Sequence, residues 1–112
     1  MTRKNKIAVL VSFSGQGGVE RSFALLVNEI VAVGVEVDLL LIKRKSPHLA
    51  ALSPAVNQIH LKRQHAVTCI NEVADYLRNE TPQALLVAKH RAIRAARKAR
   101  KKAGTDTPIT GV

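Results

Sequence analysis

The chain has 112 residues with a single cysteine, and its 18 Lys and Arg against 8 Asp and Glu give a formal net charge of +10. This length fits one domain with a buried core. The lone cysteine excludes an internal disulfide and indicates a reducing, cytoplasmic location. No segment is suited to a membrane span or an export signal. Eight of the basic residues lie between positions 89 and 102, so the basic character belongs to one segment and favours an anionic partner there.

The first 34 residues show the pattern of a strand, a tight turn and a helix. Residues 7–13 are almost continuously apolar and rich in β-branched side chains, as in a parallel strand buried on both faces. A glycine-rich turn follows at 14–18. Apolar residues then recur at helical spacing up to a C-cap at Gly34, namely Phe23, Leu26, Val27, Ile30 and Val31. Such a turn leaves backbone N–H groups at a helix N-terminus, which favour a phosphate or another anion.

The remainder of the chain alternates between strand and helix patterns. Strands are predicted at 35–42, 56–61, 84–88 and 107–112, helices from residue 65 to the Thr81-Pro82 pair and over 91–103, and a proline-containing loop at 46–54. Right-handed crossovers then imply an α/β fold, a Rossmann-like doubly wound parallel sheet of about five strands with three helices, ordered 3-2-1-4-5. Ligands bind where the winding reverses, so we expect residues 14–18 and 89–91 to face one another across one crevice.

The glycine turn does not by itself identify a ligand. Gly15 and Gly17 match the start of the dinucleotide-binding fingerprint, but Glu20 stands where the third glycine belongs, and the Gly-Lys-Ser/Thr of a phosphate-binding loop is absent. A phosphate site and a tight turn without a ligand are therefore both open interpretations. Glu20 and Arg21 are either ligand contacts or, respectively, a partner of the helix dipole and a solvated surface residue.

The histidines and the cysteine form no metal-binding pattern. No metal-ligand spacing joins His48, His60, His65 and His90, and no carboxylate or cysteine cluster completes a site. We therefore expect neither a metal nor a cofactor. His90 follows a predicted strand beside the presumed crevice, where it is either a binding residue or an ordinary loop histidine. Cys69 is interpreted as a small core residue.

The predicted helix 91–103 has two chemically different sides. One side carries small residues, Ala92, Ala95, Ala96, Ala99 and Ala103. The opposite side carries basic residues, Arg94, Arg97, Lys98 and Lys101. The alanines can pack closely on a sheet while the basic row stays in solvent. That row is either a solvated face or a contact for anionic lipid head groups or another polyanion, and the near absence of aromatic side chains disfavours nucleic acid.

Several segments, in order and spacing, give the chain a resemblance to a known family. They are Lys6-Ile-Ala-Val-Leu-Val, Gly17-Gly-Val-Glu-Arg21, Gly34-Val-Glu-Val-Asp-Leu39, Asn79-Glu-Thr-Pro-Gln-Ala-Leu-Leu86 and Lys89-His-Arg91. Together they resemble the N-terminal, acceptor-side domain of the family-four glycosyltransferases, which have the GT-B fold. The resemblance implies a retaining transfer of sugar from a nucleotide-sugar to a saccharide or lipid-linked cell-envelope acceptor.

The resemblance also implies roles for residues of the glycine turn. Gly17 and Gly18 would lie against the diphosphate or the sugar of the donor. Glu20 and Arg21 would shape that loop. On this interpretation the turn is a donor-binding element and the nucleotide-sugar is a substrate, with no metal required.

On the acceptor side, His90 and Arg91 would border the bound saccharide, and the basic helix 91–102 would fit a peripheral contact with the cytoplasmic face of a membrane.

Members of this family are longer than this chain, so residues 1–112 correspond to an N-terminal domain truncated after the fifth strand, without the C-terminal donor domain. The active-site histidine of the family is expected just beyond Val112, and no catalytic residue is assigned here. Half a cleft cannot preorganise charge around a departing diphosphate, so we expect no useful activity unless a second polypeptide supplies the other half.

A second interpretation belongs to another functional class. The chain could be a non-catalytic α/β module that binds an anionic partner, lipid head groups or nucleic acid, through the helix 91–102. Such binding would weaken steeply as the salt concentration rises. In either case, a sheet that stops after five strands and lacks later helices is expected to leave apolar surface uncovered.

Overall fold

A computed structural model describes residues 6–13, 18–44, 50–62, 69–87 and 90–111. The elements it contains are β1 (Lys6–Phe13), α1 (Gly18–Ala32), β2 (Glu36–Arg44), β3 (Asn57–His60), α2 (Ile70–Glu80), β4 (Ala84–Val87), α3 (His90–Ala103) and β5 (Ile109–Gly111). The strands form one parallel sheet in the order β3-β2-β1-β4-β5. The predicted fold class and strand order are thus confirmed.

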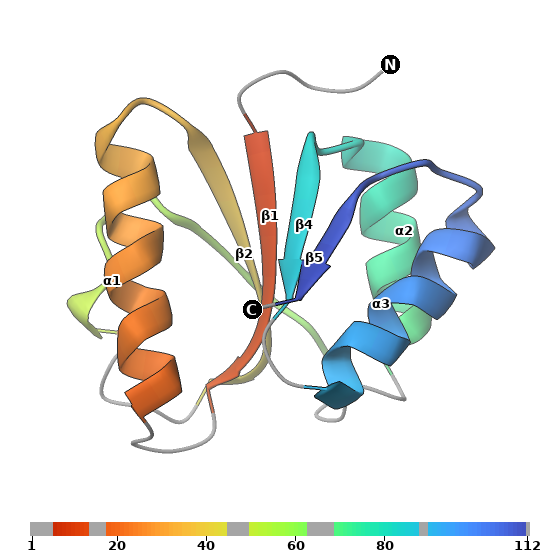
Figure 1. The fold of residues 1–112 in the computed structure, drawn as a ribbon, viewed down its shortest axis with the longest axis horizontal. Helices are drawn as coiled ribbons and strands as arrows, with labels where there is room; N and C mark the ends of the chain where they lie inside the picture. Colours follow the sequence, from red (N-terminus) through yellow and green to blue (C-terminus); the bar gives the residue numbers. More distant parts are fainter. Residues whose placement is uncertain (1–5, 14–17, 45–49, 63–68, 88–89, 112) are drawn as a thin grey trace.

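The sheet lies between two helical layers (Figure 1), with α1 on one face and α2 and α3 on the other. Alternation along β1 divides its side chains between the layers: Ala8 and Leu10 join the core under α2 and α3, whereas Val9 and Val11 join the core under α1. All four residues are buried. This is why β1 has an unbroken apolar sequence, as the central strand of a parallel sheet must.

Turn residues set the ends of the first two helices. After α1, Gly34 adopts a φ of +92°, a conformation that glycine reaches without steric cost. Thr81 ends α2 in the left-handed region, with φ 41° and ψ 60°, and its N–H donates to the carbonyl oxygen of Leu77. Pro82 follows and cannot continue the helix. Both ends were predicted from these same residues.

The observed bounds of several elements differ slightly from the predicted ones. The described part of α2 begins at Ile70, and the predicted helical residues 65–68 lie outside the described residues. The strands β3 and β5 are shorter than their apolar patterns, and β5 begins only at Ile109. Immediately before β5, the carbonyl of Pro108 accepts a hydrogen bond from the N–H of Leu85, so the pairing with β4 already starts outside the strand.

One residue of the apolar pattern of α1 lies partly on the surface. The side chains of Phe23 and Val27 are buried against the sheet, but Leu26 is 39% exposed. The apolar stripe of α1 is wider than the face that the sheet covers, and Leu26 lies at its edge. Leu26 therefore belongs to the predicted apolar spacing of α1 without being buried by the sheet.

The two-sided character predicted for the last helix is confirmed. The alanines of α3 are buried or partly buried and pack against α2 as well as against the sheet. On the other side, Arg94, Arg97, Lys98 and Lys101 are all exposed. Small side chains allow α3 to approach a second helix closely, in addition to the sheet on which they are predicted to pack.

Candidate functional site

The winding of the sheet reverses between β1 and β4, which are hydrogen-bonded neighbours. β1 ends at Phe13 and β4 ends at Val87, so both strands finish at the same edge of the sheet. α1 begins beyond β1 and α3 beyond β4 (Figure 1), with one helix on each face. Open α/β sheets bind their ligands at such an edge, and this edge is the candidate site.

The residues predicted from the glycine turn fall at the start of α1. Gly17 lies outside the described residues, and Gly18 is the first residue of α1. Glu20 and Arg21 occupy the first turn, where Arg21 is exposed. The first N–H groups of a helix have no intrahelical acceptor, so this end of α1 presents hydrogen-bond donors and a partial positive charge.

His90 and Arg91, the predicted acceptor-side residues, are the first two residues of α3. The fold therefore brings the first turns of α1 and α3 to the same sheet edge from opposite faces. Two helix N-termini at one edge favour an anion such as a phosphate over a cation. The sequence predicts that residues 14–18 and 89–91 face one another across a crevice, but residues 14–17 and 89 lie outside the described part of the chain.

The basic row of α3 is a separate feature. Among the described residues, Arg94, Arg97, Lys98 and Lys101 have no hydrogen-bond or ion-pair partner. By contrast, Arg100 on the same helix donates from Nη1 to the carbonyl oxygen of Thr107 at 3.3 Å. The four residues of the row are thus oriented into solvent, with their charge available to an external anion.

A buried polar cluster, not predicted from the sequence, lies at the opposite edge of the sheet. The ammonium of Lys6 is 2.8 Å from Oδ2 of Asp38 and 2.7 Å from Oε1 of Glu80. The hydroxyl of Tyr76 donates to Oδ2 of Asp38 at 2.6 Å, and Nδ2 of Asn57 donates to Oδ1 of Asp38 at 3.0 Å. The side chains of Lys6 and Asp38 are only 7% and 6% exposed. The signal available in the sequence was an aspartate inside an apolar strand, which requires partners.

The cluster keeps both of its buried groups charged. Burial disfavours the charge of each group, but the hydrogen bonds outweigh it. The contacts with Asp38 and Glu80 raise the pKa of Lys6 above its ordinary 10.5. The contacts with Lys6, Tyr76 and Asn57 lower the pKa of Asp38 below its ordinary 3.8. The cluster joins β1, β2, β3 and α2 and is a structural support, distant from the candidate edge.

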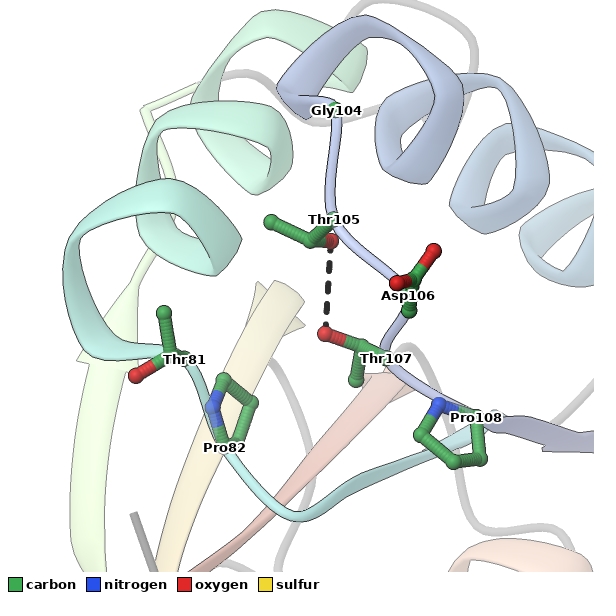
Figure 2. Close-up of a pocket in the computed structure, with 7 residues that line it drawn as sticks. All are labelled: Thr81, Pro82, Gly104, Thr105, Asp106, Thr107 and Pro108. Carbon is green, nitrogen blue, oxygen red and sulfur yellow. Dashed lines mark hydrogen bonds between the residues drawn. The ribbon is translucent and has the colours of Figure 1, made fainter. Parts of the chain in front are cut away.

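A pocket of about 270 Å³ also lies at the amino edge of the sheet, between the end of α2 and the segment that joins α3 to β5 (Figure 2). Threonines and prolines line much of it: Thr81, Pro82, Gly104, Thr105, Asp106, Thr107 and Pro108. The hydroxyls of Thr105 and Thr107 are hydrogen-bonded to each other at 3.3 Å. Because ligands of doubly wound sheets bind at the carboxyl edge, we do not assign this pocket to the candidate site.

Metal and thiol chemistry have no support in the described part of the chain. No group of three or more His, Cys, Asp and Glu residues there could hold a metal ion. Cys69 is fully buried at the start of α2. Burial, with a smaller contribution from the charge of Glu72, raises the pKa of this thiol to about 11, so it is a core residue and not a nucleophile.

Among the described residues, no helix has both the length and the apolar sequence that crossing a membrane requires. The longest of the described helices, α1, has 15 residues. A membrane-spanning helix needs about 20.

Comparison with known proteins identifies the fold. No protein-family model matches the sequence, and no curated protein matches it. The structure is similar to that of the lipopolysaccharide outer core galactosyltransferase WaaB in its apo form, with a TM-score of 0.69 and 16% sequence identity. The match covers 95% of this chain but 32% of the galactosyltransferase, so the chain spans about one third of that protein's length. In fold, this chain corresponds to one part of a GT-B glycosyltransferase, as the sequence resemblance implied.

Proposed function

We propose that this chain is the N-terminal, acceptor-side domain of a retaining GT-B glycosyltransferase. The complete enzyme would transfer a sugar from a nucleotide-sugar to a saccharide or lipid-linked cell-envelope acceptor. The observation that carries the proposal is the position of α1 and α3, whose first turns lie at one edge of the sheet. The chain around this edge has the fold of part of a galactosyltransferase.

In this proposal the N-terminal turn of α1 binds the donor. The backbone N–H groups near Gly17 and Gly18 donate to the diphosphate or the sugar, and Glu20 and Arg21 shape the loop. Glycine at these positions lets the backbone approach the phosphates without a side chain in between. At the start of α3, His90 and Arg91 border the acceptor.

The proposal also includes a second domain, which closes the cleft and supplies most of the donor contacts. This domain belongs either to a longer polypeptide or to a separate one. The transferase step needs a water-excluded site with preorganised charge around the leaving diphosphate, which one sheet edge alone does not provide. The 112-residue chain is therefore proposed to be inactive by itself.

The mass of the natural protein distinguishes the two arrangements. We would measure the intact mass in the source cells, together with the reading frame that follows Val112. A mass well above 12.2 kDa would place both domains in one polypeptide. A mass of 12.2 kDa would direct the search to a separate partner that completes the cleft.

Donor binding tests the proposal directly. With the second domain present, Gly17→Val or Gly18→Val should weaken nucleotide-sugar binding at least about tenfold, because a side chain blocks the backbone from the phosphates. Isothermal titration calorimetry would measure the dissociation constant. The matched control is Ser22→Val, because Ser22 is exposed on the same helix one turn after Gly18. This variant should bind the nucleotide-sugar with the affinity of the wild type. Equal affinity for the glycine variants and the control would refute the assignment of the loop.

A second candidate function rests on α3. The exposed basic row, Arg94, Arg97, Lys98 and Lys101, has no partner among the described residues. We propose that this row contacts an anionic surface, either as the peripheral membrane contact of the enzyme or as the sole function of a non-catalytic module. Lipid head groups suit it better than nucleic acid, because base stacking needs aromatic side chains and only 3% of the residues are aromatic.

A further inference from the structure

The pocket at the amino edge of the sheet has no role in the proposed transferase. Its volume of about 270 Å³ is just below the range of pockets that hold drug-sized molecules, which starts at about 300 Å³. Figure 2 shows Thr81 and Pro82, at the end of α2, on one side of it. Thr105 and Thr107, from the segment that joins α3 to β5, lie on the other side. Two distant segments thus build one cavity, which has room for a single small ring.

One wall of the pocket contains a strained residue. Thr81 has φ 41° and ψ 60°, and among the described residues it is the only one besides glycine with a positive φ. A β-branched side chain is rare in this left-handed region, and a residue before proline favours an extended backbone. After α3, on the other side of the pocket, Gly104 takes a φ of +72° without steric cost. The fold therefore holds a threonine where glycine would be relaxed, and such strain concentrates at ligand-binding sites.

The other wall presents hydrogen-bonding groups. Thr107 is only 6% exposed, and its hydroxyl donates to that of Thr105 at 3.3 Å. The hydroxyl of Thr105 keeps its own proton for another acceptor. Asp106 is exposed, and among the described residues its carboxylate has no hydrogen-bond or ion-pair partner. Both α2 and α3 end beside the pocket, and the carbonyls at a helix C-terminus carry a partial negative charge. The pocket therefore favours ligands that donate hydrogen bonds.

Hydrogen bonds fix this wall before a ligand binds. The N–H of Gly104 donates to the carbonyl oxygen of Arg100 at 3.0 Å, and Nη1 of Arg100 donates to the carbonyl oxygen of Thr107 at 3.3 Å. The N–H of Leu85 donates to the carbonyl oxygen of Pro108 at 2.8 Å, which joins the segment to β4. A site that is already formed loses little conformational entropy when it binds a ligand.

The chemistry of the lining selects a neutral ligand that is rich in hydroxyl groups. Among the described residues that line the pocket, none is basic, so a phosphate or carboxylate would meet Asp106 without a counter-ion. The hydroxyls of a ligand can donate to that carboxylate and exchange hydrogen bonds with the threonines. The rings of Pro82 and Pro108 add apolar surface, on which the C–H groups of a sugar ring can pack. A saccharide unit combines both properties.

We propose that this pocket is a second saccharide site, in which Thr81, Thr105 and Asp106 bind the hydroxyls of one neutral sugar unit. Pro82 and Pro108 precede β4 and β5, whereas the candidate edge lies where β4 ends. A sugar in the pocket is therefore remote from the proposed transfer, and the site tethers the domain to a saccharide without reacting with it. The inference does not depend on the proposed transferase function, and either one can fail while the other stands.

Amide NMR spectra of the isotope-labelled 112-residue chain test the site. The probes are glucose, galactose and mannose, with glucuronate as the anionic counterpart of glucose. At least one neutral sugar should shift the amide signals of Thr81 and of residues 104–107 and leave those at the starts of α1 and α3 unchanged. Glucuronate should bind at least about tenfold more weakly than glucose, because its carboxylate is repelled by Asp106.

Three variants identify the binding groups. Asp106→Ala should weaken sugar binding at least about tenfold, since hydrogen bonds to a charged acceptor are the strong ones. Thr81→Gly should weaken it about threefold or more, because a hydroxyl is lost, and should raise the melting temperature by a few degrees, because the strain is relieved. The matched control is Thr110→Val, an exposed position on β5 outside the pocket, which should leave the affinity unchanged.

Four results would overturn the proposal. The first is an absence of shifts around the pocket with all three neutral sugars. The second is equal binding of glucose and glucuronate, and the third is equal affinity of Asp106→Ala and Thr110→Val. The fourth is a lower melting temperature in Thr81→Gly, which would mean that this threonine serves the fold and not a ligand. The probes are free sugars and the variants lie away from Gly17 and Gly18, so none of these results tests the proposed donor site.

Discussion

The side chain of Asp38 on β2 connects three other elements. Its carboxylate accepts hydrogen bonds from Lys6, Tyr76 and Asn57, which come from β1, α2 and β3. A buried charge is costly unless it is paired and fully hydrogen-bonded. Asp38 meets that condition, and its partners depend on it in turn, because Lys6 would retain only the half-exposed Glu80.

We expect Asp38→Ala to lower the free energy of unfolding by about 3–5 kcal/mol, since it leaves the buried ammonium of Lys6 without its main counter-ion. Urea unfolding followed by circular dichroism would measure the loss. The control is Asp75→Ala, which removes an exposed ion pair with Arg78 at 3.1 Å and should cost about 0–1 kcal/mol. Equal losses in the two variants would show that the buried cluster is not a special support.

The partners of Asp38 illustrate why part of the structure could not be predicted. The sequence places an aspartate within the apolar run of β2, and this alone calls for a buried partner. Lys6 and Glu80, however, are 74 positions apart, and only the assembled sheet and α2 bring them together. The exposure of Leu26 could not be predicted for a related reason, because periodicity identifies the apolar side of a helix but not how much of that side a neighbour covers.

At the scale of elements, α3 separates packing from charge more clearly than the other described helices. Its alanines allow close contact with α2, and its basic row stays in solvent. Residue spacing alone predicted both sides correctly. Because the four side chains of the basic row, Arg94, Arg97, Lys98 and Lys101, are exposed, changing them should cost little packing, and this makes α3 suitable for a binding test.

We expect the wild-type chain to bind vesicles of phosphatidylcholine containing phosphatidylglycerol and to leave pure phosphatidylcholine vesicles unbound. Replacing Arg94, Arg97, Lys98 and Lys101 together by serine should remove roughly 4 kcal/mol of binding free energy, at about 1 kcal/mol per basic residue. Vesicle co-sedimentation at a series of salt concentrations would measure the vesicle affinity of the wild type and of the fourfold serine variant.

The matched control for this test changes basic residues away from α3. Arg21→Ser with Lys62→Ser removes two exposed charges and should leave vesicle binding nearly as strong as in the wild type. Binding that persists in the fourfold serine variant would exclude α3 as the anionic contact. Binding that is insensitive to salt would exclude an electrostatic contact altogether.

At the scale of the whole molecule, the strand order was predictable and the covering of the sheet was not. Alternating strand and helix patterns with right-handed crossovers leave few topologies, and β3-β2-β1-β4-β5 was the expected one. At the candidate site, the sequence predicted that residues 14–18 and 89–91 face one another across a crevice, and the structure brings the starts of α1 and α3 to that edge. Side-chain roles at that edge stay predictions, because they depend on segments outside the described residues and on a second domain.

The buried ion pair between Lys6 and Asp38 also predicts how the stability of the whole fold depends on pH. The pKa of Asp38 is lower in the folded chain than its ordinary 3.8, so its contribution is present above about pH 4 and is lost as the pH falls through the folded pKa. The pKa of Lys6 is raised above 10.5, so its contribution is complete below that value and is lost at still higher pH.

Thermal melts from acidic to alkaline pH should therefore show a melting temperature that is constant in the middle of the range. It should fall at the acidic end and at the alkaline end. In Asp38→Ala both falls should become shallower, because the coupled groups no longer shift each other's pKa. A variant profile parallel to that of the wild type would indicate that other groups control the pH dependence. At each pH, the melting temperature of Asp38→Ala is subtracted from that of the wild type. This difference removes the effect of titratable groups that both proteins contain.

The central position of β1 has a consequence for how the protein is made. β1 leaves the ribosome before the other described strands, yet it pairs with β4 as well as β2, and Lys6 has to reach Glu80. Until the α2 and β4 segments have been synthesised, one edge of this apolar strand stays unpaired and its lysine lacks a counter-ion on α2. Contacts between such distant positions form late and slow folding, and the open edge meanwhile promotes aggregation. A nascent chain paused before residue 80 should therefore be a strong substrate for chaperones that bind exposed β-strands.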